Sequence, residues 1–249
     1  MAKLVLENAQ MFKKSVDAIA VLIDEAEFVL DLNGFSLKAT DPSQISMVDF
    51  SLPKSAFKEF VVDSVQKIGV DLDYLSQVMS RSKAKDSLVL ELDLENGRLG
   101  VQFVGTSTRT FSIPLIDVSS TELPNPKIDF DAELKLKGEV LQDALKDAQL
   151  ISTHVTLGVT ESCFYVKASS SKGELNNISN KDDAEMLDFR VKTECKSMYP
   201  LDYLQDMLKT ASSSDVVELS LKSNAPVKIS YRIGDAVITY FLAPRIETE

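Results

Sequence analysis

Several features that serve catalysis or membrane insertion are scarce or missing in this sequence. The 249 residues include no tryptophan, one histidine and two cysteines. No apolar run approaches the roughly 20 residues that span a bilayer, and residues 1–8 lack the apolar core of a signal peptide. Cys163 and Cys195 fit neither a disulfide framework nor a metal site. We therefore expect a cytoplasmic protein with reduced thiols and no membrane association.

Groups suited to catalysis are also few. The single histidine, His154, has apolar neighbours in a predicted strand, which is typical of an ordinary strand residue. The sequence has no Gly-rich phosphate loop and no Walker lysine. Asp182, Asp183 and Glu185 lie in a polar loop without the spacing of metal ligands, so a solvated turn is the better interpretation. We predict no enzymatic activity, no metal site and no cofactor.

Acidic residues outnumber basic ones, and the formal net charge is -11. Such a charge argues against a protein whose whole surface attracts nucleic acid. It is compatible with a local basic face, so the positions of the cations matter more than their sum.

One stretch of the chain occurs twice. Leu72–Leu75 recurs as Leu201–Leu204, 129 positions later, and each copy runs on to an aspartate, Asp86 or Asp215, at the same offset. The offset also relates residues farther upstream, such as Phe35 and Phe164. A single offset across predicted helix, turn and strand indicates an internal duplication. Chance similarity of two amphipathic helix–strand units is the alternative.

Apolar periodicity predicts four amphipathic helices and many short strands. The helices span 9–23, 72–80, 139–151 and 201–209, and Asn8 suits the N-cap of the first. Asn33–Gly34 and Asn96–Gly97 are typical hairpin turns. Strands are predicted at 3–7, 25–31, 35–39, 45–52, 87–94, 99–104, 108–114, 129–136, 155–159, 164–168, 174–179 and 187–191, with further strands up to 242.

Residues 117–128 contain two prolines and no period, which is typical of a stiff linker. They divide the chain into a domain at 1–116 and a second at 129–249. The predicted fold is α+β. In each domain, antiparallel sheets would carry two helices on one face and leave the other face exposed.

Cations project from the predicted helices or follow their ends: Lys13, Lys14, Arg81, Lys83, Lys85, Lys146 and Lys209. If the four helices share one face of the molecule, that face carries these cations. Asp143, Asp147 and Asp206 dilute the positive charge, and a charged helix face is commonly only a solvated one. Contact with nucleic acid and simple solvation therefore both remain possible interpretations of this face.

Five segments, spread over nearly the whole chain, carry a family likeness: Leu37–Ser43, Ser82–Asp86, Gly105–Phe111, Pro114–Asp117 and Leu242–Ile246. The last is the most specific, because it combines unusual composition with a fixed place at the terminus. Together they resemble the archaeal and eukaryotic DNA sliding clamps of the proliferating cell nuclear antigen family, the archaeal members most closely. The resemblance implies a ring of three subunits whose helices line a hole around duplex DNA. Such a clamp is a non-catalytic processivity factor of replication and repair, which slides on DNA without reading its sequence.

The resemblance also implies a partner-binding pocket under the linker. By position it would consist of Thr40, Gln44, Ile45, Leu123, Pro124, Ile128, Pro226, Phe241, Leu242, Ala243, Pro244 and Ile246. DNA polymerase, clamp loader, ligase and flap nuclease would dock there through short PIP-box peptides with a glutamine and apolar or aromatic anchors. Residues 120–122 depart from the common linker pattern, which leaves partner preference open.

Two predicted edge strands would join the subunits of the ring, because exposed strand edges invite pairing. The joint would use Arg109, Thr110, Phe111, Ser112 and Ile113 of one copy, and Gly173, Glu174, Leu175 and Asn176 of the next. Arg109 would add an ionic contact across it.

Two alternatives to a homotrimeric clamp follow from the same sequence. The chain could be one subunit of a heterotrimeric clamp, or a non-clamp enzyme subunit on a duplicated α+β scaffold. A clamp would be cytoplasmic and DNA-associated, or nuclear if its source is eukaryotic.

Overall fold

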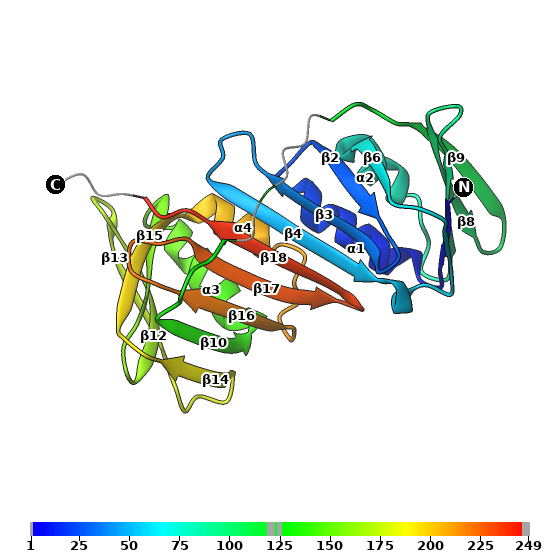
Figure 1. Ribbon diagram of the computed structural model, residues 1–249. Coiled ribbons are helices and arrows are strands. Elements are labelled where there is room, and N and C mark those ends of the chain that lie inside the picture. Colours follow the sequence, from blue (N-terminus) through cyan, green and yellow to red (C-terminus); the bar gives the residue numbers. More distant parts are fainter. Residues whose placement is uncertain (1, 119–122, 124–125, 246–249) are drawn as a thin grey trace. The chain divides into compact units, whose positions relative to one another are not determined.

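A computed structural model describes residues 2–118, 123 and 126–245 (Figure 1). These residues form two compact units. The first consists mainly of residues before 119, together with 233–238, and the second mainly of residues after 125, together with 43–47. Most of the central part of the predicted linker, 117–128, lies outside the described residues.

The first unit is α+β, with two helices and two strand layers. Its strands pair antiparallel in the orders β5-β1-β7-β8-β9 and β4-β3-β2-β6. The elements are β1 (Ala2–Leu6), α1 (Ala9–Ala20), β2 (Glu25–Leu30), β3 (Gly34–Thr40), β4 (Ser46–Pro53), a 3-10 turn (Lys54–Ala56), β5 (Glu59–Val62), β6 (Gln66–Asp71), α2 (Leu72–Met79), β7 (Ser87–Asp93), β8 (Arg98–Val104) and β9 (Thr108–Pro114).

The second unit repeats this plan. Its strand orders are β14-β10-β16-β17-β18 and β13-β12-β11-β15. The elements are β10 (Ala132–Lys137), α3 (Gly138–Gln149), β11 (His154–Val159), β12 (Cys163–Ser170), β13 (Gly173–Asn180), β14 (Met186–Val191), β15 (Cys195–Pro200), α4 (Leu201–Leu208), β16 (Val216–Leu221), β17 (Val227–Ile233) and β18 (Ala236–Leu242). Both helices of the first unit begin 129 positions before their counterparts here, and so do β2 and β11. The predicted duplication is confirmed.

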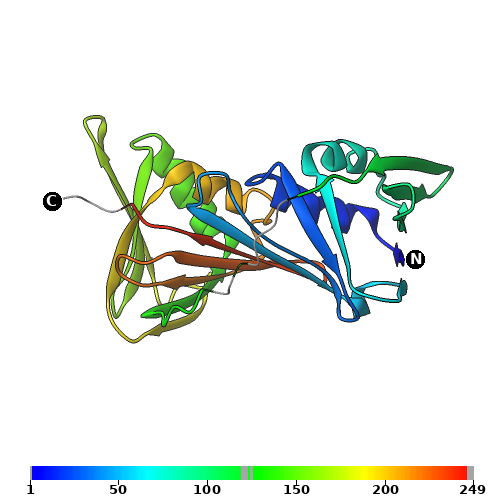
Figure 2. The same cartoon turned by 45° about the horizontal axis from the view of Figure 1, so that its top comes forward.

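The helices form where an apolar stripe coincides with a start signal. The Asn8 side chain accepts the backbone N–H groups of Gln10 and Met11, as predicted for the N-cap of α1. Asp71 caps α2 in the same way through the N–H of Tyr74. The stripes of α1 and α2 pack against each other and against strands, and α3 and α4 form the equivalent pair (Figure 2). None of the helices in the described ranges has the length and apolarity needed to cross a membrane.

Three strands escaped prediction: β5, β6 and β15. Gly69 interrupts the apolar alternation of β6. The segment that follows β9 passes close to the backbone of Gly69. The Ile116 N–H donates to the Gly69 carbonyl at 3.0 Å, and a Cβ on residue 69 would lie 2.1 Å from the Ile116 carbonyl oxygen. Only glycine at position 69 allows Ile116 to approach this closely, and that glycine breaks the apolar alternation by which β6 would have been predicted. The first helix also ends earlier than predicted, at Ala20 instead of residue 23.

Each unit has its own core. In the first, Phe28 stacks on Phe35 with ring centroids 4.6 Å apart. In the second, the buried Tyr231 hydroxyl donates to the Met207 carbonyl at 2.8 Å and so ties the end of α4 to the sheet. These cores hold the helix faces in place, and those faces carry most of the predicted cations.

Candidate functional site

The solvent-facing side of α1 carries two neighbouring lysines, Lys13 and Lys14, which differ in exposure and in ion pairing. Lys13 is half-buried, and its Nζ lies 2.5 Å from Asp17 Oδ2. Lys14 is exposed and forms no ion pair with another described residue. Because Lys13 is neutralised by a carboxylate one turn away, Lys14 is the stronger candidate for contact with an external anion.

A basic loop, residues 81–85, follows α2. Its sequence is Arg-Ser-Lys-Ala-Lys, and Arg81, Lys83 and Lys85 are exposed without an ion pair to any described residue. The Ser82 hydroxyl donates to the Met79 carbonyl at 2.7 Å. The Gln10 side chain of α1 donates to the Ser82 carbonyl at 2.9 Å. The backbone of the loop is therefore fixed, while its cationic side chains stay available.

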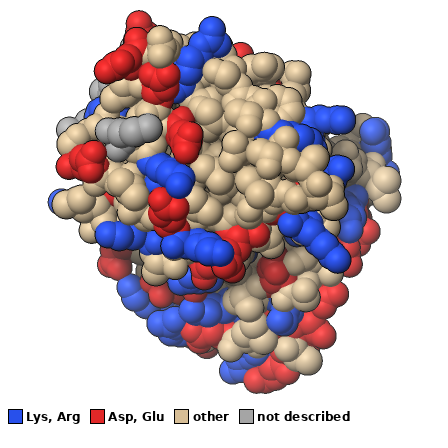
Figure 3. Space-filling view, turned by 90° about the vertical axis from the view of Figure 1, so that its right-hand side faces the viewer, with Lys and Arg blue, Asp and Glu red and all other residues tan. Residues whose placement is uncertain are grey.

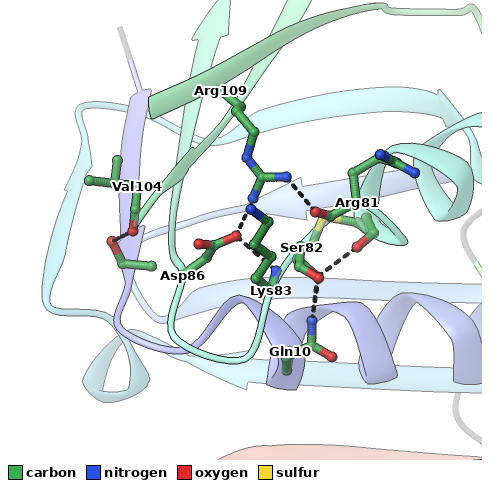
Figure 4. A network of polar contacts seen from close by, with 9 residues as sticks. Gln10, Arg81, Ser82, Lys83, Asp86, Val104 and Arg109 are labelled. Carbon is green, nitrogen blue, oxygen red and sulfur yellow. Dashed lines mark hydrogen bonds and ion pairs between the residues drawn. The ribbon is translucent and has the colours of Figure 1, made fainter. Parts of the chain in front are cut away.

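A buried ion pair anchors the basic loop to β9 (Figure 4). The Arg109 guanidinium pairs with the Asp86 carboxylate and donates to the Arg81 carbonyl at 2.6 Å. Asp86 also accepts the Lys83 N–H at 2.8 Å, and its side chain is only 4% exposed. Arg109 lies over the Phe103 ring, 5.3 Å from its centroid. Arg109, predicted to make an ionic contact across the subunit joint, here engages its own chain.

The anchoring role of Asp86 was missed from the sequence, although a signal was present. Asp215, at the repeat offset, accepts the Ser212 N–H at 2.8 Å just as Asp86 accepts that of Lys83. The aspartate that ends both copies of the repeat is therefore a turn-stabilising residue in each. Only the first copy adds an arginine.

Removing the Asp86 carboxylate should destabilise the first unit strongly. Asp86→Ala leaves the partly buried Arg109 unpaired, so we expect the free energy of unfolding to fall by about 3 kcal/mol. Glu59→Ala, which removes the exposed partner of Lys3, is the matched control and should cost about 0.5 kcal/mol. Urea unfolding of both variants gives the comparison. Equal losses would show that the Asp86 pair is no more important than a surface pair.

The helix face of the second unit is less basic. Lys146 Nζ lies 2.9 Å from Asp143 Oδ1, and Lys209 forms the C-cap of α4. Burial raises the pKa of Asp206, while nearby Lys209 opposes this shift. The counterpart of the basic loop, residues 210–214, contains no cation. Among the cations on the helices and in the loops after them, those without an ion pair to a described residue thus concentrate in the first unit.

Two edge strands carry the predicted subunit joint. Within the described residues, β9 pairs only with β8, and β13 pairs only with β12. Arg109 is the one charged residue of β9, and Thr110 and Ser112 are exposed on it. Figure 3 shows the side of the molecule on which β8 and β9 lie in Figure 1, and a broad area there carries neither Lys and Arg nor Asp and Glu. Both strands thus offer unpaired backbone groups for another strand.

The predicted partner pocket falls partly within the second unit. The Ala243 N–H donates to the Ile45 carbonyl at 2.8 Å, which joins the C-terminal segment to residues 43–47 of this unit. Phe241, Ala243 and Pro244 are half-buried, so part of each side chain is open to solvent. The side chain of Leu242 is fully buried and packs in the core.

Pro226 extends this apolar surface. Ser230 and Thr239 face each other across β17 and β18, with their hydroxyls 2.9 Å apart. In that antiparallel register Pro226 lies opposite Ala243, on the same face as Phe241. We call these three residues, together with Ile45 and Pro244, the apolar partner surface.

The remaining predicted partner residues lie in both units and differ in exposure. Thr40 ends β3 and Leu123 is half-buried, both in the first unit. Gln44 is exposed with a φ of 58°, and Ile128 is half-buried. Pro124 and Ile246 lie outside the described residues.

The described residues offer little for catalysis. His154 Nδ1 lies 3.0 Å from the Thr153 hydroxyl, and no carboxylate among the described residues forms a hydrogen bond or ion pair with its ring. Burial raises the pKa of the Cys195 thiol to about 11, so this thiol stays protonated at neutral pH. In the part of the chain that the structure covers, no three His, Cys, Asp or Glu side chains gather as a metal site would require.

A duplicated α+β chain with paired helices, cations near their ends and an edge strand in each unit has the features that the resemblance to the sliding clamps implies. Comparison with known proteins agrees. The N-terminal domain pattern of proliferating cell nuclear antigen matches residues 1–122, and the C-terminal domain pattern matches residues 125–246. The chain belongs to the proliferating cell nuclear antigen family.

The relatives and solved structures that are similar to the chain include archaeal sliding clamps. The DNA polymerase sliding clamp of Pyrococcus furiosus is 38% identical over 98% of both chains, and that of Methanococcus maripaludis 37% over 97% of this chain and 98% of its own. The crystal structure of the Thermococcus kodakaraensis protein superposes with a TM-score of 0.94 at 28% identity, covering 98% of this chain and all of that one. The A. fulgidus protein bound to the C-terminal region of FEN-1 gives 0.90 at 27% over both full chains. A PCNA2–PCNA3 complex from Sulfolobus tokodaii gives 0.89 at 26%, over 98% and 100%.

Proposed function

We propose that this chain performs the sliding-clamp function of its family as a closed ring of three copies around duplex DNA. The observation that carries the ring is that β9 in the first unit and β13 in the second are edge strands, each paired on one side only among the described residues. Head-to-tail pairing of such edges gives a closed ring when the rotation closes. We place the domains at 1–116 and 129–249, joined by the linker 117–128. Native mass spectrometry of the pure chain tests the ring.

The proposed DNA-facing groups are the cations at and after the helices. Lys and Arg attract phosphates without reading bases, so a ring lined by them can slide. Lys14, Arg81, Lys83, Lys85 and Lys209 are exposed and form no ion pair with a described residue, which suits this role. Lys13 and Lys146 would first have to leave Asp17 and Asp143. The proposed lining therefore rests mainly on the first unit.

The chain would act by tethering other enzymes and would catalyse no reaction itself. The protonated Cys195 thiol and a histidine that no described carboxylate orients, His154, support this proposal. Its partners would be DNA polymerase, clamp loader, ligase and flap nuclease. The FEN-1 segment bound to the A. fulgidus relative supports docking of short peptides. Its place in the cell would be on DNA in the cytoplasm, or in the nucleus of a eukaryotic source.

Peptide binding should depend on Phe241. A few buried anchors normally dominate binding at an apolar surface, so Phe241→Ala should weaken a glutamine-containing, aromatic-anchored partner peptide by about 2 kcal/mol. Phe189→Ala, which removes another half-buried ring, from β14, is the control and should bind normally. Fluorescence anisotropy with a labelled peptide measures both. Equal affinity of the two variants would place the docking surface elsewhere.

A second arrangement, one subunit of a heterotrimeric clamp, draws on the PCNA2–PCNA3 complex of the Sulfolobus relative. The joint pairs two different strands, so neighbouring subunits need not be identical. The same native mass spectrum separates the possibilities: a pure chain that stays monomeric and closes only with sister chains is a heterotrimer subunit.

A further inference from the structure

A polar hollow of about 590 Å³ opens on the second unit. Its floor is a row of side chains across β15, β11 and β12. Thr156 pairs with Met198 on one side and with Lys167 on the other. The Arg245 N–H donates to the Met198 carbonyl at 2.8 Å, so the C-terminal segment adds one more chain to the row. Three strand spacings of about 4.8 Å separate Arg245 from Lys167, a span of about 14 Å with a cation at each end.

The hollow is a locally basic site on an acidic protein. Lys167, Arg245 and His154 line it, against the single carboxylate of Glu174. Neither Lys167 nor Arg245 forms an ion pair with a described residue. Lys167 Nζ lies 4.5 Å from the centroid of the Tyr165 ring, which orients the ammonium group without using its hydrogen-bond donors. Glu174 belongs to β13, the strand proposed to join the next copy.

The hollow opens away from the helices. Successive strand residues point to opposite faces, and Val155, Leu157 and Val166 are buried on the side where α3 packs. Thr156 and Lys167, which alternate with them, therefore lie on the far side of the sheet from the proposed DNA lining. Small-molecule pockets are mostly apolar, and this one is lined chiefly by polar and charged groups, so an acidic chain segment suits it better.

The hollow continues the apolar partner surface. Arg245 directly follows Ala243 and Pro244, so a peptide held along those residues reaches the basic row at its next step. We propose that the hollow binds acidic residues that flank the apolar anchors of partner peptides, with Lys167 and Arg245 as the specificity-determining cations. This inference rests on the proposed partner surface.

The test measures the affinity of the assembled full-length chain for a set of peptides that share one core with a glutamine and an aromatic anchor. The peptides differ in the flank next to this core, which consists of glutamates, glutamines or lysines and is placed at either end. We expect the peptide with a glutamate flank at the end that reaches the hollow to bind about fivefold tighter than the peptide with a glutamine flank there. This factor is the effect of two exposed charge pairs. In Lys167→Gln/Arg245→Gln the two peptides should bind equally, with the glutamine-flank affinity unchanged. Lys172→Gln/Arg232→Gln removes the same charges outside the hollow and should keep the preference.

Each other outcome overturns the inference. Equal binding of the two flanks to the wild type, or a preference that survives in Lys167→Gln/Arg245→Gln, would show that the hollow does not select charge. Loss of the preference in the control pair would assign it to net charge. A labelled single-stranded oligonucleotide that binds the wild type but not the hollow variant would place nucleic acid there. Failure of every peptide to bind would contradict the proposed partner surface as well as the hollow. It would not bear on the proposed ring, because retention of the ring on DNA is measured separately.

Discussion

A chain with proline in place of Ser112 should run as a folded monomer and lose nearly all stimulation of a DNA polymerase. Ser112 lies in the middle of β9, opposite Gly100 of β8, and β9 has no second neighbour among the described strands. Proline removes one backbone donor and disfavours further pairing, while edge strands tolerate it within the fold. Native mass spectrometry and primer extension on circular DNA measure the two effects.

Ser112→Ala is the control, because it keeps the backbone N–H, and it should remain a fully active trimer. If proline lowers the thermal midpoint by more than about 5 °C, the shift expected for about 1 kcal/mol, Thr110→Lys/Ser112→Lys replaces it. That pair leaves every amide in place and puts charge on the exposed edge. A trimer of unchanged stability in both variants would mean that β9 is not the joint.

The second large effect is expected from the lining. Replacing Lys14, Lys83, Lys85 and Lys209 with alanine should weaken DNA binding equally on all sequences. It should also lower the salt slope by about 0.9 for each phosphate that no longer pairs with a lysine. The measurement is the binding constant for labelled duplexes of differing sequence over a range of salt. Lys13 is left in place because Asp17 already holds it.

The matched control replaces Lys127, Lys172, Lys181 and Lys196, which are equally exposed but lie outside the helix faces and the basic loop. Its net charge is the same as that of the lining variant. An equal loss in both variants would assign the effect to overall charge, and an unchanged salt slope in the lining variant would mean that these lysines do not face DNA.

Local signals explain why much of the fold was predictable. The helix stripes, the Asn8 cap and the Asn33–Gly34 turn all depend on residues within a few positions of one another. The 129-residue offset then carried each assignment from one unit to the other, and α1 and α3 indeed begin at that spacing. Resemblance to the family supplied the ring and the partner pocket, which periodicity alone does not contain.

Long-range placement explains what was missed. Arg109 and Asp86 are 23 positions apart and meet only because β8 and β9 fold back beside the basic loop. The same hairpin places Arg109, which was predicted to make an ionic contact across the joint, beside Asp86 of its own chain. The hollow depends on the register of β15, β11 and β12 together with the Arg245–Met198 hydrogen bond. No pattern in any one segment of the sequence reveals it.

The central claim, that the ring encircles DNA, is tested most directly by comparing its retention on circular and on linear DNA. The chain should be loaded by its own clamp loader and ATP onto a nicked circular plasmid, separated from free protein by gel filtration, and then challenged with a restriction enzyme that cuts the plasmid once. A closed ring that encircles and slides should stay with the circular DNA and leave through the ends when the DNA is linear. Equal retention on circular and linear DNA would contradict encirclement and would mean that the protein binds DNA by contact alone.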